Sequence, residues 1–234
     1  MEAQDAATAY FFKLWEWVET NLRTVVIGII IVAIAAVVIS YYFWRQSEME
    51  VAAGKALTQL LVSTPPNSDA SQLANSYLGI AADYPGTPAG GRALVLGAAT
   101  LFASGNYPEA QAQFQKYVSL YPTGPFSATA ALGVAASLDA QGKTDSAADT
   151  YQRVVTSYSD PNAVDAAKFA LARIDAQRGK LTEAENYYQD VIRNNPNSLL
   201  GTEAAFQAMQ LREKLPAPST SNNPPASFNL STQP

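Results

Sequence analysis

The sequence of 234 residues contains no cysteine and no histidine. The absence of cysteine excludes disulfides, thiol nucleophiles and thiolate metal ligands. The absence of histidine removes the commonest general base and the commonest transition-metal ligand. Any chemistry would have to come from carboxylates, lysine, serine, threonine and tyrosine. We therefore expect a protein that is not an enzyme and that binds no cofactor and no metal.

Charged residues are also sparse, at 15% of the chain, and the formal net charge is −5. No predicted helix carries a basic stripe, so we expect no nucleic-acid partner. Asp145 and Asp149 stand at helical spacing, where a solvated face explains them better than acid–base chemistry. No glycine-rich phosphate loop follows a strand, because no strand is predicted, and we expect no small-molecule substrate.

The one long hydrophobic run spans residues 24–44 and lies between Arg23 and Arg45. Its 21 residues would measure about 31 Å as a helix, which matches the hydrocarbon core of a bilayer. Aromatic residues end the run where a signal peptide would need small ones, so we predict an uncleaved transmembrane helix. Residues 1–23, with five aromatics from Tyr10 to Trp17, are predicted to form an interfacial segment, and a disordered tail is the alternative.

The charges beside this run do not determine its orientation. Lys13 and Arg23 precede it, and Arg45 and Lys55 follow it. The positive-inside rule needs an imbalance between the two sides, and here the two sides are equal.

A period of 37 residues runs through the rest of the chain. A glycine is followed five residues later by alanine and nine residues later by an aromatic residue. The three sets are Gly105, Ala110 and Phe114; Gly142, Ala147 and Tyr151; and Gly179, Ala184 and Tyr188. A fixed period of this length is typical of stacked helix-turn-helix units. The glycines suit left-handed turns just past a helix end, and the alanines and aromatics suit the packing between two paired helices.

Breakers and caps divide the chain into predicted helices. Residues 46–64 continue the transmembrane helix until Pro65, and Ser68 or Asp69 caps a helix that extends to about Asp83. The later helices are predicted at 88–103, 108–120, 125–140, 143–157, 162–177, 181–194 and 199–214. Residues 45–214 are thus a helical repeat domain. Residues 215–234 are rich in proline, serine and asparagine and are predicted to be a disordered tail.

At the level of motifs, residues 50–214 resemble the tetratricopeptide repeat (TPR) family. The family pattern has small residues at positions 8 and 20 of each repeat, an aromatic residue at position 24 and proline at position 32. Three units carry the first three features, at Ala98, Ala110 and Phe114; Ala135, Ala147 and Tyr151; and Ala172, Ala184 and Tyr188. Position 32 holds Pro122 and Pro196 in the outer two units but Ser159 in the middle one, and an earlier unit is degenerate, with Leu73 at position 20. The resemblance implies an all-α fold, a TPR-like α-solenoid of antiparallel helix pairs after a single transmembrane helix.

The 37-residue repeat that closes with Tyr-Pro is similar to the repeats of BamD-like proteins of the bacterial envelope. The layout of a short tail, one span and a TPR domain is similar to the YfgM-like ancillary proteins of the bacterial Sec translocon. This resemblance implies a single-pass protein of the inner (cytoplasmic) membrane, with the TPR domain in the periplasm and the bilayer contacted through residues 24–44. Two hypotheses follow for its protein partners. The chain is a translocon-associated or chaperone-like ancillary factor, or it is a structural scaffold or accessory subunit of a larger membrane protein complex.

The family positions that line the inner surface of a TPR stack imply a mildly apolar groove. The candidate partner-binding residues are Arg92, Val95, Phe102, Leu132, Asp139, Phe169 and Arg173, with Ala99, Thr129 and Ala136 between them. Phe102, Leu132 and Phe169 would anchor a bound peptide or helix. The alternative is that these apolar residues pack against neighbouring helices or against the terminal helix.

Overall fold

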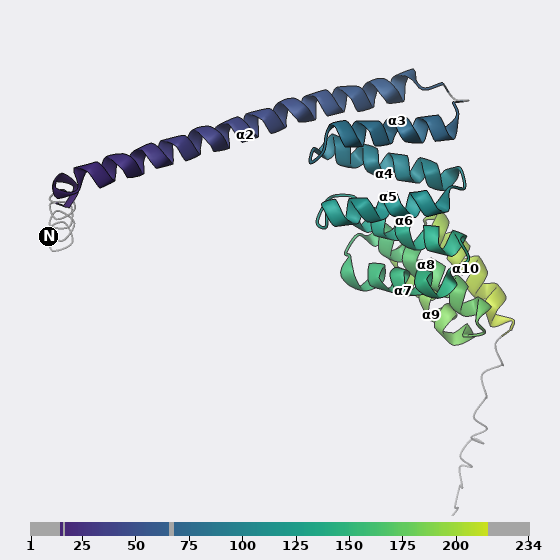
Figure 1. Ribbon diagram of the computed structural model, residues 1–234. Coiled ribbons are helices and arrows are strands. Elements are labelled where there is room, and N and C mark those ends of the chain that lie inside the picture. The colour runs from purple at the N-terminus through teal and green to yellow at the C-terminus, as the bar shows by residue number, and fades with distance from the viewer. Residues whose placement is uncertain (1–14, 16, 66–67, 215–234) are drawn as a thin grey trace, which may run out of the picture. The chain divides into compact units, whose positions relative to one another are not determined.

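The computed structural model describes residues 15, 17–65 and 68–214, and all regular structure in these ranges is helical (Figure 1). The helices are α2 (Leu22–Ser63), α3 (Ala70–Asp83), α4 (Pro88–Ala103), α5 (Tyr107–Leu120), α6 (Ser127–Ala140), α7 (Thr144–Ser157), α8 (Pro161–Gln177), α9 (Leu181–Asn194) and α10 (Leu199–Arg212). The predicted tail and most of the predicted interfacial segment lie outside the described residues. Backbone contacts divide the chain into two units: the first comprises Met1–Ser68 and Ser76–Ala93, and the second Asp69–Asn75 and Leu94–Pro234.

In the first unit, α2 is a single helix of 42 residues (Figure 1). It contains no proline, and it ends before Pro65, where the Thr64 N–H still donates to the Leu60 carbonyl. Its most apolar window of 18 residues has no buried side chain. By length and composition, α2 is therefore able to cross a membrane.

The C-terminal half of α2 is bonded to the turn between α3 and α4. Gln46 Nε2 donates to the Gly86 carbonyl at 2.9 Å, and the Ala89 N–H donates to Glu50 Oε2 at 3.0 Å. The Glu50 carboxylate therefore lies at the N-terminus of α4, where the unpaired N–H groups of the first turn favour negative charge. Leu57, farther along α2, is buried.

The second unit is a stack of helix pairs. Each helix from α5 to α10 packs against the next one, and α6 also contacts α8, as α8 contacts α10. Contacts between alternate helices are what a solenoid of antiparallel pairs requires, because each pair stacks on its neighbours. The prediction of an all-α TPR-like solenoid is confirmed.

The turns and the helix interfaces follow the 37-residue period. Gly105, Gly142 and Gly179 have φ values of +83°, +75° and +77°, in the left-handed region that was predicted for them. The three repeat alanines are fully buried, and the three aromatics four residues later are at most 5% exposed. Of the two residues predicted as the N-cap of α3, Ser68 and Asp69, the structure selects Asp69. Its Oδ1 accepts hydrogen bonds from the N–H groups of Ser71 and Gln72.

Candidate partner-binding groove

A hollow of about 230 Å³ lies between α4, α5 and α6. Its lining consists of Ala99, Phe102, Phe114, Thr129, Leu132, Gly133 and Ala136. Five of these seven were expected to face the groove from the first helices of two successive repeats. Phe102 and Leu132 are both half-buried, so each side chain keeps an exposed face toward the hollow.

Phe114 and Gly133 were not expected to line the groove. Phe114 is the packing aromatic of α5, and its ring lies against α6 at Gly133. A Cβ atom at position 133 would come within 2.7 Å of that ring, so glycine is what lets α6 approach it closely. The glycine inside a predicted helix was the sequence signal for this close approach.

Asp139 and Arg173 are brought together by the fold. The Arg173 guanidinium forms an ion pair with the Asp139 carboxylate and so links α6 to α8. The Tyr151 phenol is close by: burial and, to a lesser degree, the negative charge of Asp139 raise its pKa to about 12. Two of the three charged residues predicted for the groove are thus paired with each other, and neither of them lines the hollow around Phe102 and Leu132.

The remaining predicted residues lie elsewhere. Phe169 packs edge-on against Tyr188, with ring centroids 5.4 Å apart, and borders the core cluster of α8, α9 and α10. Val95 is only 8% exposed, so its side chain is part of the core. Arg92 is exposed on α4, in the part of that helix that belongs to the first unit.

The terminal helix does not fill the hollow. Helix α10 packs against α9 and α8, and none of its residues lines the space around Phe102 and Leu132. Of the alternatives left open by the sequence, packing against a neighbouring helix holds for Phe169. Among the described residues, no group of three or more Asp or Glu side chains is arranged to hold a metal ion.

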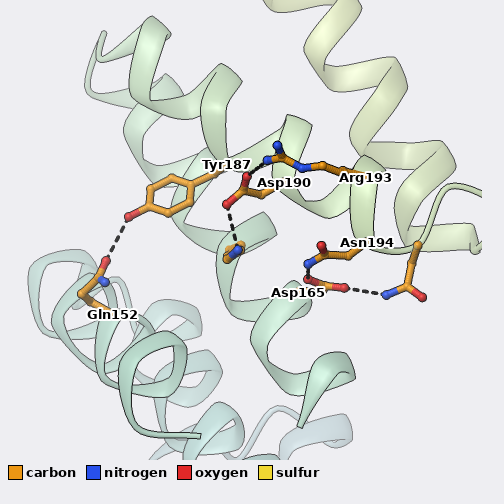
Figure 2. A network of polar contacts seen from close by, with 8 residues as sticks. Gln152, Asp165, Tyr187, Asp190, Arg193 and Asn194 are labelled. Atoms are coloured by element: carbon orange, nitrogen blue, oxygen red, sulfur yellow. Dashed lines mark hydrogen bonds and ion pairs between the residues drawn. The ribbon is translucent and has the colours of Figure 1, made fainter. Parts of the chain in front are cut away.

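A polar network closes the surface between α7, α8 and α9 (Figure 2). The Tyr187 hydroxyl donates to Gln152 Oε1 at 2.9 Å, and Lys168 Nζ donates to Asp190 Oδ2 at 2.8 Å. Arg193 also pairs with Asp190. The hydrogen bond from Lys168 and the positive charges of Lys168 and Arg193 lower the pKa of Asp190 below its ordinary value.

Two family models match the chain. A model described as a tetratricopeptide repeat-like domain matches residues 15–157, and a tetratricopeptide repeat model matches residues 166–198. The search of curated proteins gave no match.

The solved structures to which the chain is similar include a T3SS complex from Aeromonas hydrophila, at 20% sequence identity. That match covers 58% of this chain and 89% of the other, with a TM-score of 0.46. Another is the putative kinesin light chain TPR-like repeats of Podosopora anserina, at 16% identity, 73% and 89% coverage and a TM-score of 0.48.

Proposed function

The chain belongs to the tetratricopeptide repeat-like family, and we propose that it is a membrane-anchored module that binds a segment of a partner protein between α4 and α6. The observation that carries the proposal is the hollow around Phe102 and Leu132. It is apolar, it has the Phe114 ring on one side, and no described segment of the chain fills it. An apolar side chain of a partner would lose its contact with water there and gain contacts with the rings of Phe102 and Phe114 and with the Leu132 side chain.

Anchoring in a membrane is supported by α2. Its apolar window is unburied, and the bonds from Gln46 and Glu50 to the start of α4 join the C-terminal part of α2 to the repeats. We propose that the membrane is the bacterial inner membrane and that the repeats are periplasmic, on the resemblance in layout to TPR proteins of the envelope.

Within that setting, we propose a translocon-associated or chaperone-like ancillary factor. Such a factor needs a surface that accepts apolar segments with little demand for charge. The hollow meets this need, because none of the residues that line it is charged.

A scaffold or accessory subunit of a membrane complex is the second candidate, and one feature of α2 favours it. A hollow on α2 includes the small residues Gly28, Ala33 and Ala36. Small residues allow the backbone of another membrane helix to approach closely. In this case the span would bind the complex together with the repeats.

The test is site-specific photo-crosslinking of the full-length protein in its native membrane. A photoreactive amino acid at position 132 is compared with one at the exposed turn position Lys143. We expect discrete adducts from position 132 alone, identified by mass spectrometry. Translocon subunits or a periplasmic chaperone would support the ancillary factor, and a fixed set of other subunits, lost when residues 24–44 are replaced by an unrelated span, would support the scaffold.

A matched pair of substitutions tests the hollow itself. Phe102→Ser removes the half-buried aromatic that lines it, and Phe206→Ser removes a 49% exposed phenylalanine on α10 that lies outside it. We expect the first to lower the adduct yield at position 132 by about tenfold or more, since loss of a buried aromatic anchor costs 2 kcal/mol or more. Equal yields from both variants would rule out the hollow as the binding site.

A further inference from the structure

A second hollow, of about 190 Å³, lies between α5, α6 and α7. It is lined by Gln115, Val118, Ala131, Val134, Thr150, Arg153, Val154, Ser157 and Tyr158. Ala131 and Val134 lie on the side of α6 opposite to Thr129, Leu132 and Ala136 by helical geometry. The two hollows are therefore separate sites on two faces of the same helix.

The second hollow has an apolar floor and a polar rim. Val134 and Val154 are buried beneath it. Gln115, Ser157 and Tyr158 stand at the rim, and none of their side chains has a hydrogen-bonding partner within the described part of the chain. A ligand in this place would meet an apolar surface surrounded by open donors and acceptors.

Arg153 at the rim differs from the other arginines of the second unit. Each of the others has a carboxylate partner: Arg173 with Asp139, Arg178 with Asp145, Arg193 with Asp190, and Arg212 with Glu185. Arg153 Nη2 donates to the Thr150 hydroxyl at 2.8 Å, and no carboxylate of the described residues lies within ion-pair distance of it. Asp149, one turn earlier on α7, is exposed and is not paired with it.

The next repeat shows which side chains occupy the corresponding place between α7, α8 and α9. A step of 37 residues converts Gln115 into Gln152, Thr150 into Tyr187, Ala131 into Lys168, and Arg153 into Asp190. These four later residues belong to the network of Figure 2, in which Tyr187 donates to Gln152 and Lys168 donates to Asp190.

The hollow between α5, α6 and α7 lacks the large side chains that fill the corresponding place one repeat later. Thr150 and Ala131 are too short to fill the space that the Tyr187 ring and the Lys168 chain occupy in the later repeat. Arg153 stands where Asp190 would be, so the charge at this corner is reversed. The open groove therefore lacks a large apolar group and a negative charge.

We propose that this hollow binds a peptide segment of a partner protein that carries a carboxylate next to a large apolar side chain. The carboxylate pairs with the Arg153 guanidinium, and the apolar side chain lies on Val134 and Val154, in the space that corresponds to the Tyr187 ring. The volume suits a single side chain, since a cavity of about 150 Å³ in another protein holds benzene. This site does not depend on the hollow around Phe102.

The carboxylate has two possible sources in a peptide, an acidic side chain or the chain's own C-terminus. Three fluorescein-labelled peptides distinguish them. The first is Gly-Ser-Gly-Ser-Phe with a free C-terminus, the second is Gly-Ser-Gly-Phe-Glu-Ser with an amidated C-terminus, and the third replaces the glutamate of the second by glutamine. Each is titrated with the full-length protein in detergent micelles, and binding is followed by fluorescence polarisation against empty micelles.

We expect saturable binding of the first or the second peptide and about tenfold weaker binding of the third, because a hydrogen-bonded charge pair is lost. Arg153→Gln should weaken the favoured peptide by about tenfold as well. Lys116→Gln is the matched control: it removes the same charge from an exposed residue of α5 that does not line the hollow, and it should change affinity by less than about twofold.

Thr150→Tyr gives a test that does not use charge. It introduces the residue that fills the later groove, and we expect it to abolish peptide binding while circular dichroism shows an intact helical fold. Arg153 is exposed, so Arg153→Gln decides the question if the tyrosine variant fails to fold. Absence of saturable binding by both carboxylate peptides, or equal binding by wild type and Arg153→Gln, would overturn the proposal.

Discussion

The buried carboxylate of Asp165 accepts hydrogen bonds from two consecutive asparagine side chains, at 2.6 Å from Asn195 Nδ2 and at 2.7 Å from Asn194 Nδ2 (Figure 2). Asp165 is 1% exposed and lies on α8, whereas the two amides stand at the end of α9. One repeat earlier, the places of Asp165 and Asn195 are taken by Ala128 and Tyr158. The final helix pair is thus held by a buried polar contact that the pair before it lacks.

Loss of this carboxylate should destabilise the stack. In Asp165→Ala the amides of the half-buried Asn195 and the exposed Asn194 lose their acceptor, and the loss of two hydrogen bonds to a charged group should lower the free energy of unfolding by about 1–3 kcal/mol. Urea unfolding of the full-length protein in detergent, followed by circular dichroism, measures the change. Asp149→Ala removes a carboxylate from an exposed site and should change stability by less than about 0.5 kcal/mol. Similar losses in both variants would contradict a special role for Asp165.

Two glycines should respond to alanine in opposite directions. Gly179 has a φ of +77°, a conformation that costs an alanine about 1 kcal/mol, so Gly179→Ala should destabilise the fold. Gly79 lies within α3, and a Cβ there would have open space around it. Gly79→Ala should therefore stabilise by about 0.5–1 kcal/mol, because alanine loses less conformational entropy in a helix. Thermal unfolding compares the two variants, and a destabilised Gly79→Ala would contradict the reasoning.

Gly133→Ala should act on stability and on binding together. Its methyl group would come within 2.7 Å of the Phe114 ring, so that the ring or α6 has to shift, at a cost of about 1–3 kcal/mol. The same methyl group would protrude into the hollow around Phe102 and Leu132 and lower the crosslinking yield at position 132. Gly54→Ala, at a position on α2 with nothing within 4 Å, is the control and should leave the yield unchanged. A Gly133→Ala protein with wild-type stability would show that α6 and the Phe114 ring can move apart without a cost in free energy.

The Tyr151 phenol makes the fold sensitive to high pH. Burial, reinforced by Asp139, raises its pKa from 10.0 to about 12, so the folded state holds this proton more tightly than the unfolded state does. The resulting stability is fully present below pH 10 and is lost as the pH rises toward 12, by roughly 3 kcal/mol for a shift of this size.

The measurement is urea unfolding of the full-length protein between pH 9 and pH 12. Tyr151→Phe keeps the ring in the core and removes the ionisable group, so its stability should fall less steeply with pH than that of the wild type. Parallel pH profiles for the two proteins would show that Tyr151 does not contribute to the alkaline loss.

The helices of this protein and their order were determined by the sequence alone, because the signals that define them are local. Proline and glycine mark the ends, and α4 and α9 have the predicted bounds of 88–103 and 181–194. Helix α6 begins at Ser127, two residues later than predicted, because the Ser127 N–H donates to the Gly124 carbonyl and residues 124–127 form a turn. The apolar length of α2 and the buried alanines and aromatics likewise follow from spacing along one chain segment.

The tertiary structure alone decided which side chains meet across helices. Phe102 and Leu132 share one hollow, whereas Phe169, at a similar position in the last repeat, packs against Tyr188. The hollow between α5, α6 and α7 and the corresponding place between α7, α8 and α9 are one repeat apart. The later place is filled by Tyr187 and Lys168, whereas the earlier one, with Thr150 and Ala131, is open. The outcome depends on the combined volume and charge of side chains from three helices, and the positions of those helices relative to one another are set only when the chain packs.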